Sequence, residues 1–523
     1  MPPVATPQTG GLTRRQVVER GLFGAAVVAT TGCGGRSDAR HLAGPPAPAV
    51  PATALGVPAP ARHGTVRSPL RQLARDVRGP VLMPRTSAAL VYNERFTDRR
   101  PRVVVQPRDA RDVQAVVRWA QRHGLALTAR SGGHSYAGYS TVAGGVVLDL
   151  RRMRDVRVTR GHVRVGGGAQ LIDVHTELAR HGGMLPTGSC PSVGVGGSTQ
   201  GGGMGLSGRA LGLTCDNVQA FTIVTPDGRL RRCDKRTHAD LFWACRGGGG
   251  GNFGIVTSFE FAPHAARRVA WFLLSWPWEQ AGEALAAWQR LAPHAPHALT
   301  SVLVLSAGAG HPQVHAIGQY FGSERQLLAV LRPGRGGAAQ QRLRELPCAG
   351  QAMAGCAHIG LPACHTAGTA AGGRMSRARF VAGSAFVEPP LSAEGRDALL
   401  AGVKRPHPEA GVLILDAYGG VINRKAPDAT AFAHRSALFG VQILTYVGPQ
   451  RVGSGMSWKR RVEHLLRRHV SGAAYQNYID PQLDGWERAY YGANLPRLRE
   501  VRARVDPENL MRFPQSIPRA ERW

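Results

Sequence analysis

Short apolar runs alternate with amphipathic stretches at the start of the predicted folded region. Residues 103–106 form a β-branched run, and the apolar positions from Val113 to Ala120 then recur at helical spacing before a stop at Gly124. Residues 125–130 predict a returning strand. The valines of residues 156–158 and 163–165 alternate around Arg160 and Gly161, which predicts a hairpin, and residues 171–178 predict a helix that ends at Gly182.

From about residue 263 to residue 451 the pattern changes to β-rich runs separated by helical stretches. The clearest of these runs are residues 271–275, 301–305, 412–418 and 441–446. The side chains that would recognise a ligand in this segment are not evident from the sequence. The first pattern is typical of an α/β unit, and a chain of 523 residues, at about 150 residues per domain, predicts two to four domains.

Three glycine-rich stretches stand out. They are residues 131–136, which follow a predicted strand, residues 188–217, and residues 247–251. Gly203, Gly205 and Gly208 satisfy the spacing of a dinucleotide-binding fingerprint, but no strand directly precedes them. We therefore interpret residues 188–217 as an extended, irregular loop that packs against a large planar cofactor. Three such loops predict a dinucleotide that is held mostly by backbone groups.

Six sequence blocks carry a family resemblance. They are RSGGHSYAG at 130–138, GSCPSVGVGG at 188–197, GLTCDNV at 212–218, DLFWACRGGGGGNFGIVT at 240–257, YQNYID at 475–480 and YYGANLPRLREVRARVDPENLMRFPQSIP at 490–518. In this order they resemble the berberine-bridge-enzyme-like flavin oxidases. The resemblance implies an α+β, two-domain vanillyl-alcohol-oxidase type FAD-binding fold, with a substrate domain built on a large antiparallel sheet.

The resemblance also implies a division of the chain. Residues 67–262 would form the first part of the FAD-binding domain, residues 263–451 the substrate domain, and residues 452–523 a C-terminal segment that completes the FAD-binding domain. By the same resemblance, FAD would be bonded twice, through its 8α-methyl to His134 and through C6 to Cys190. Imidazole nitrogen and thiolate are good nucleophiles, which suits both positions.

The resemblance also places further residues at the cofactor. Tyr475 and Tyr478 resemble the tyrosines that approach flavin and substrate, and a tyrosine acts as a base only where its phenolate is stabilised. Gln442 resembles a sheet position that faces the flavin, and Val193 a position that gates oxygen. Ser198 departs from the family, in which histidine is common. The remaining expected cofactor-binding residues are Arg130, Ser131, Gly132, Gly133, Ser135, Tyr136, Gly188, Gly194, Gly197, Gly202, Gly203, Asp216, Asn217, Gly251, Asn252, Phe253, Gly254, Ile255, Val256, Asn494 and Gln515.

Charge and the N-terminus add expectations about location. The formal net charge is +31, and all but four of the 65 basic residues are arginine. They are scattered and no nucleic-acid-binding motif occurs, so we expect no specific nucleic-acid partner but allow association with an anionic cell envelope. Arg14 and Arg15 before a short apolar run resemble a twin-arginine export signal over residues 1–33, which implies use of that export machinery. Cys33 is a weak candidate for lipidation, and the Pro- and Ala-rich residues 34–66 predict a linker.

Eight cysteines leave a disulfide framework open once the protein is exported, and Cys356 with Cys364 is the preferred pair because one short loop separates them. No second ligand pair near Cys364 and His365 has zinc-like spacing, so no metal site is predicted. The leading hypothesis is an exported FAD-dependent oxidase that takes a hydride from an alcohol or a carbohydrate hemiacetal, or from a secondary-metabolite alcohol, and reduces oxygen to hydrogen peroxide. The alternatives are a dehydrogenase with another acceptor, and a basic envelope-associated protein that binds FAD without turnover.

Overall fold

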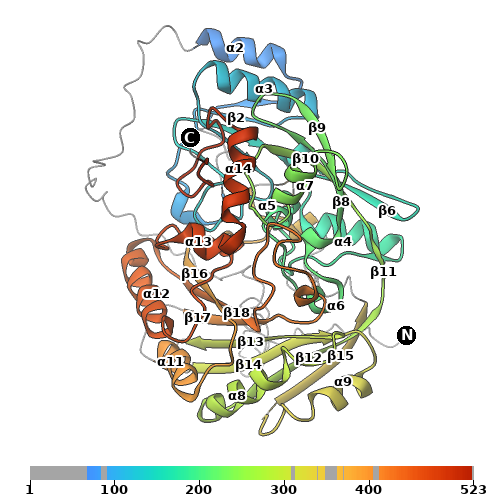
Figure 1. Ribbon diagram of the computed structural model, residues 1–523, viewed down its shortest axis with the longest axis vertical. Coiled ribbons are helices and arrows are strands. Elements are labelled where there is room, and N and C mark those ends of the chain that lie inside the picture. Colours follow the sequence, from blue (N-terminus) through green and yellow to red (C-terminus); the bar gives the residue numbers. More distant parts are fainter. Residues whose placement is uncertain are drawn as a thin grey trace, which may run out of the picture.

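The computed structural model describes residues 67–83, 91–307, 312–338, 340–347, 362–368, 370, 372–404 and 411–520. The expected export signal, linker and lipidation site at residues 1–66 therefore lie outside the described residues. Figure 1 shows an upper part built from the first and last segments of the chain, above a large sheet from its middle. The upper part thus combines residues from both ends of the described chain.

The upper part begins with a small mixed sheet in the order β1-β2-β4-β3. Its strands β2 and β3 both run parallel to β4, as a strand–helix–strand crossover requires. The carboxylate of Asp109 accepts hydrogen bonds from the backbone N–H groups of Arg111 and Asp112, and so caps the crossover helix. The elements of this layer are α2 (Arg67–Asp76), β1 (Val81–Leu82), β2 (Val103–Val105), α3 (Ala110–Arg122), β3 (Leu127–Arg130) and β4 (Val146–Asp149).

A second, antiparallel sheet of five strands packs next to it in the order β5-β6-β10-β8-β9. The predicted hairpin is present, and Gly161 adopts a φ of 81° at its turn, where a side chain would be strained. The elements here are β5 (Val156–Thr159), β6 (His162–Gly166), α4 (Leu171–Arg180), β8 (Val218–Val224), β9 (Leu230–Asp234), α7 (Ala239–Ala244) and β10 (Ile255–Phe261), with a small pair β7 (Gly183–Met184) and β11 (His264–Ala265).

The prediction of one extended loop over residues 188–217 is wrong for its middle. Residues Val195–Gln200 form the short helix α5 and Gly208–Leu211 form α6. A Cβ at Gly196 would lie 2.6 Å from the carbonyl oxygen of Gly167, so the glycine lets α5 approach that backbone closely. Tertiary packing here outweighs the low helix propensity of glycine.

The middle of the chain forms an antiparallel sheet of seven strands in the order β15-β12-β14-β13-β17-β18-β16. Its strands are β12 (Arg268–Trp276), β13 (Leu299–Ala307), β14 (Pro312–Tyr320), β15 (Gln340–Pro347), β16 (Phe380–Val387), β17 (Gly411–Ala417) and β18 (Phe439–Tyr446). The helices α8 (Ala281–Leu291), α9 (Glu324–Leu331) and α11 (Ala393–Lys404) lie toward the bottom of Figure 1, and α12 (Val452–Leu466) lies at the left of the sheet.

The two faces of this sheet have different roles because side chains alternate along each strand. One face, with Phe272, Leu303 and Leu413, packs against the four helices and forms the largest apolar core. The opposite face carries Trp271, Val302, Ile317 and Ile414, and it is turned toward the glycine-rich loops. This second face forms the floor of the cavity described below.

The chain then returns to the upper part through α13 (Trp486–Tyr491) and α14 (Leu495–Val505), and α14 packs against α7. Within the described part of the chain, no helix has the length and apolar character that a bilayer crossing requires.

Candidate active site

A cavity of about 310 Å³ lies where the three glycine-rich stretches meet the open face of the seven-stranded sheet. Residues 475–479, Phe513 and Gln515 of the C-terminal segment complete its lining. The expected site residues that line it are Ser131, Gly132, Gly133, His134, Ser135, Tyr136, Gly188, Cys190, Val193, Gly194, Gly197, Gly203, Gly251, Asn252, Gly254, Val256, Gln442, Tyr475, Tyr478 and Gln515. Segments that are far apart in the sequence therefore contribute to one site.

The other expected residues lie behind this lining and support it. The guanidinium of Arg130 pairs with the Asp149 carboxylate at 2.9 Å, and the amide of Asn494 donates to the carbonyl of Pro427 at 2.8 Å. The remaining members of the set belong to the apolar core, to a loop backbone or to a polar network: Phe253, Ile255, Gly202, Asp216 and Asn217. These residues contact other protein groups and are not part of the lining. They would therefore affect cofactor binding through the shape of the loops.

His134 lies, partly exposed, at the wall of the cavity. Its Nε2 atom lies 3.0 Å from the hydroxyl of Ser192, and its ring stacks on Tyr92 with 3.9 Å between ring centroids. Burial lowers the pKa of His134 to about 3, so the imidazole is neutral at ordinary pH. A neutral imidazole has a nitrogen lone pair available for bond formation with an electrophile.

Cys190 lies on the neighbouring loop, and its Sγ atom is 3.9 Å from the same Ser192 hydroxyl. Cys190 and Cys364 are each in a disulfide, whereas Cys215, Cys233 and Cys245 are free thiols. A thioether from Cys190 to a flavin therefore requires that its disulfide be opened first. Cys356, the expected partner of Cys364, lies outside the described residues.

Asp416 is a site residue that sequence reasoning missed. It lies near the end of β17, lines the cavity, and accepts a hydrogen bond from the hydroxyl of Tyr478 at 3.3 Å. Burial raises the pKa of Asp416 to about 7, and the hydrogen bond from Tyr478 only partly offsets this. A carboxyl group with this pKa can accept and release a proton near neutral pH, as a general base must.

The two expected catalytic tyrosines are protonated in this environment. Burial raises the pKa of Tyr475 to about 12 and that of Tyr478 well above its usual value. The Tyr475 hydroxyl oxygen accepts hydrogen bonds from the backbone N–H of Gly203 at 2.9 Å and from the amide of Asn477 at 2.9 Å. Tyr478 instead donates to Asp416. These contacts favour Asp416, rather than either phenolate, as the proton acceptor.

Gln442 and Tyr136 complete the polar side of the cavity. The amide of Gln442, on β18, donates to the Tyr136 hydroxyl at 2.7 Å. The ring of Tyr136 stacks on that of Tyr478 with 5.5 Å between centroids. Tyr136 comes from the first glycine-rich loop, so this contact links the loop to the sheet and to the C-terminal segment.

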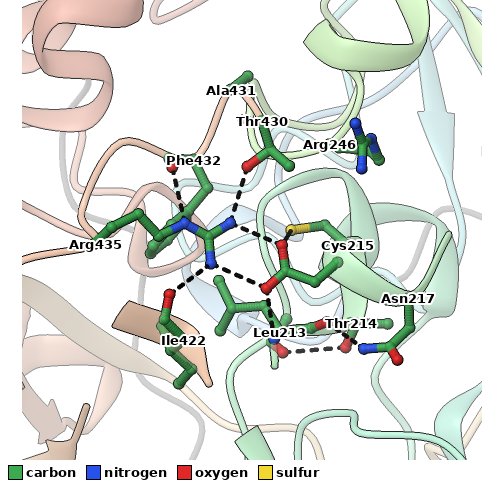
Figure 2. A network of polar contacts seen from close by, with 12 residues as sticks. Leu213, Thr214, Cys215, Asn217, Arg246, Ile422, Thr430, Ala431, Phe432 and Arg435 are labelled. Carbon is green, nitrogen blue, oxygen red and sulfur yellow. Dashed lines mark hydrogen bonds and ion pairs between the residues drawn. The ribbon is translucent and has the colours of Figure 1, made fainter. Parts of the chain in front are cut away.

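A buried ion pair clamps two loops behind Tyr475. Both guanidinium NH₂ groups of Arg435 donate to the Asp216 carboxylate, at 2.9 and 2.8 Å, and both side chains are almost fully buried. Figure 2 shows the same guanidinium bonded to Thr430 and to the carbonyl groups of Ile422 and Phe432. The ring of Phe432 packs against Tyr475 with 5.9 Å between centroids. The clamp thus holds the wall on which Tyr475 rests.

Comparisons with known proteins agree with this geometry. A family model described as "FAD binding domain" matches residues 101–234, and one described as "Berberine and berberine like" matches residues 474–518. The uncharacterised FAD-linked oxidoreductase YgaK of Bacillus subtilis is 32% identical over 442 residues, which cover 82% of this chain and 94% of YgaK. The chain belongs to the berberine-bridge-enzyme-like FAD-linked oxidoreductases.

This berberine-bridge-enzyme-like protein also resembles characterised relatives. The chitooligosaccharide oxidase of Gibberella zeae is 29% identical over 444 residues, which cover 80% of this chain and 87% of the oxidase. The solved structure of BBE-like 1 from Physcomitrella patens has a TM-score of 0.80 at 27% identity and covers 87% of this chain and 100% of that one. The expected α+β FAD-binding fold and the assignment as an oxidoreductase are therefore confirmed.

The berberine-bridge-enzyme-like cavity fits FAD, the cofactor of the family. The side-chain oxygen of Gln200, a buried residue in the lining, has no hydrogen-bond partner within the protein, and a Cβ at Gly197 would meet no atom within 4 Å. A buried polar atom without a partner is costly, so it indicates a bound group. The described lining contains no lysine or arginine, which favours binding of the cofactor through backbone N–H groups and hydroxyls.

Among the described residues, no group of three or more His, Cys, Asp or Glu side chains could hold a metal ion.

Proposed function

We propose that the protein is an FAD-dependent oxidase that removes a hydride from a carbon bearing a hydroxyl group. The observation that carries the proposal is the pair of Asp416 and Tyr478, 3.3 Å apart, in a cavity that also contains His134 and Cys190. Bound FAD supplies the chemistry of hydride acceptance and electron delivery to oxygen, with hydrogen peroxide as product. Oxidation of an alcohol also releases a proton, which a protein group must accept.

Asp416 accepts that proton from the substrate hydroxyl at its carboxylate oxygen. Tyr478 donates a hydrogen bond to Asp416 and so orients the carboxylate toward the cavity. Tyr475, held by the backbone of the second glycine-rich loop, fixes the side wall. The rings of Tyr136, Tyr475 and Tyr478 line this part of the cavity, and water excluded by them and by a bound substrate would strengthen the interaction between the carboxylate and the substrate hydroxyl.

His134 and Cys190 would hold the flavin covalently. In support of His134, its imidazole is neutral and part of the lining. Cys190 lies close by, with both residues next to the Ser192 hydroxyl. The second attachment would follow reduction of the Cys190 disulfide by a dithiol, because the thiolate is the nucleophile.

Oxygen as the acceptor is supported by Val193, which lines the cavity. By resemblance, Val193 occupies the position that gates oxygen. One variant of the pollen protein Phl p 4 is named a glucose dehydrogenase, whereas the same variant with an additional isoleucine-to-valine change is named a glucose oxidase. Use of another acceptor by this protein is the second candidate function.

The test is peroxide formation in air by the purified flavoprotein with a panel of primary alcohols, secondary alcohols and sugars. We expect peroxide in equal amount to the carbonyl product with at least one member, and loss of turnover in Asp416→Asn. Carbonyl product that forms only when an artificial electron acceptor is added would instead establish the dehydrogenase.

We also propose that the protein is exported through the twin-arginine route, from the sequence signal at Arg14 and Arg15. Anionic envelope polymers are then accessible to its positive surface. Fractionation of producing cells tests this: the protein should reach the exterior, and the double variant Arg14→Lys, Arg15→Lys should remain inside. Equal export of the variant would contradict the proposal.

A further inference from the structure

The floor of the cavity beside Asp416 is an apolar patch. We call it the sheet patch, and it consists of Trp271 on β12, Val302 on β13 and Ile317 on β14, with Leu206 from the second glycine-rich stretch packed against it. Val302 stands directly opposite Ile317 on one side and Asp416 on the other. Directly opposed residues on neighbouring strands are in side-chain contact. The sheet patch therefore begins next to the carboxylate.

The described lining of the cavity is almost without charge. Asp416 is its one acidic residue, and neither lysine nor arginine is part of it. An anionic substrate would thus have no cationic partner and would meet the carboxylate, which disfavours its binding.

The sheet patch also offers few polar groups. It could not replace the hydrogen bonds that the hydroxyl groups of a polyol make with water. Among the residues that the sheet contributes to the described lining, Thr300, Asp416 and Gln442 are polar, and the Gln442 amide already donates to Tyr136. A sugar placed here would leave several hydroxyl groups facing Trp271, Val302 and Ile317. Buried polar groups without partners are disfavoured, whereas an apolar surface gains from burial at the same place.

We infer that the substrate is an uncharged alcohol whose hydroxyl-bearing carbon is attached to an apolar group. The hydroxyl group lies at Asp416 and Tyr478, and the apolar group covers the sheet patch. This inference rests on the proposed function, and it makes Val302 a residue that determines specificity.

The experiment follows flavin reduction in the holoprotein under anaerobic conditions, with cinnamyl alcohol as the aromatic probe and with glucose and cellobiose as sugar probes. We expect the second-order rate constant for cinnamyl alcohol to exceed that for either sugar by at least about 100-fold. Val302→Thr adds a hydroxyl at nearly constant volume and should lower the value for cinnamyl alcohol about 10-fold, mainly through weaker binding.

The matched control is Val304→Thr, on the same strand and the same face but outside the cavity lining. It should retain the rate constant of the parent protein. Faster reduction by a sugar than by cinnamyl alcohol would overturn the inference while leaving the proposed function intact. Equal effects of Val302→Thr and Val304→Thr on the rate constant would have the same meaning. If dithionite reduced the flavin but none of the three compounds did, the result would contradict both the inference and the proposed function.

Discussion

At the scale of single residues, Asp416 is the most consequential side chain in the account. It is one carboxylate within the apolar sequence of β17, where a sequence pattern offers no reason to select it. Its role arises because the fold brings it to Tyr478, which lies 62 positions further along the chain. Tyr475 and Tyr478 were predictable as cavity residues because both occur in the block YQNYID, and Gln442 because its strand position resembles that of the family, whereas the protonation of the tyrosines depends on burial that no block encodes.

The raised pKa of Asp416 predicts the pH dependence of turnover. The base must be deprotonated, so kcat/KM should rise with pH and level off above about 7. Asp416→Asn should lower kcat/KM by about 10²–10⁴-fold and abolish this limb of the profile, as measured by peroxide formation from pH 5 to 9. If Asp416→Asn kept the same rise of kcat/KM with pH, a group other than Asp416 would be responsible for that rise.

The same shift has a consequence for stability. The folded protein favours the protonated carboxyl, so the contribution of Asp416 is fully present below its unfolded pKa of about 3.9 and declines as the pH rises through about 7. This carboxylate is therefore retained at the expense of stability near neutral pH, which is a common property of catalytic groups.

His134 and Cys190 lead to a separate prediction at this scale. After acid denaturation, we expect flavin to remain on a peptide that contains His134, because its neutral imidazole is available. Flavin should be bonded to Cys190 only in molecules whose Cys190 disulfide has been opened. Peptide mass mapping before and after mild reduction measures both. Release of all flavin into the acid supernatant would contradict covalent attachment.

At the scale of secondary-structure elements, hydrophobic spacing and alternation predicted several of the helices and strands. The helix α3 contains the apolar positions from Val113 to Ala120, and the hairpin of β5 and β6 turns at Gly161, as these patterns predict. The helix α5 was missed because two of its six residues are glycine, and local propensity therefore points away from a helix. Its formation depends on close contact with the backbone at Gly167, which is a tertiary effect.

The buried ion pair between Asp216 and Arg435 joins two loops, and it predicts how much this contact contributes to the free energy of unfolding. Asp216→Asn leaves the buried guanidinium without its counter-charge and should lower the free energy of unfolding by about 3–5 kcal/mol. Urea denaturation of the purified variants measures this. The matched control is Asp240→Asn, at the half-exposed ion pairs with Arg497 and Arg504, where the loss should be below about 1 kcal/mol. Equal losses in the two variants would contradict a clamping role.

At the scale of the whole molecule, the family resemblance predicted the fold, because its blocks span both ends of the chain. The seven strands of the large sheet all lie within the segment 263–451 that the sequence analysis assigned to the substrate domain. The lining of the cavity could not be predicted in the same way. It takes single residues from strands that are distant in sequence, such as Trp271, Val302 and Asp416, and only the register of the sheet brings them together.

The central claim is that the cavity of this FAD-linked oxidoreductase oxidises an alcohol with flavin as the immediate acceptor. Anaerobic mixing of the purified holoprotein with cinnamyl alcohol, followed by admission of oxygen, tests it most directly. The account predicts loss of the visible flavin band during the first step, and its return with one hydrogen peroxide per flavin during the second. A flavin band that persists with every alcohol and sugar, yet disappears with dithionite, would contradict the claim.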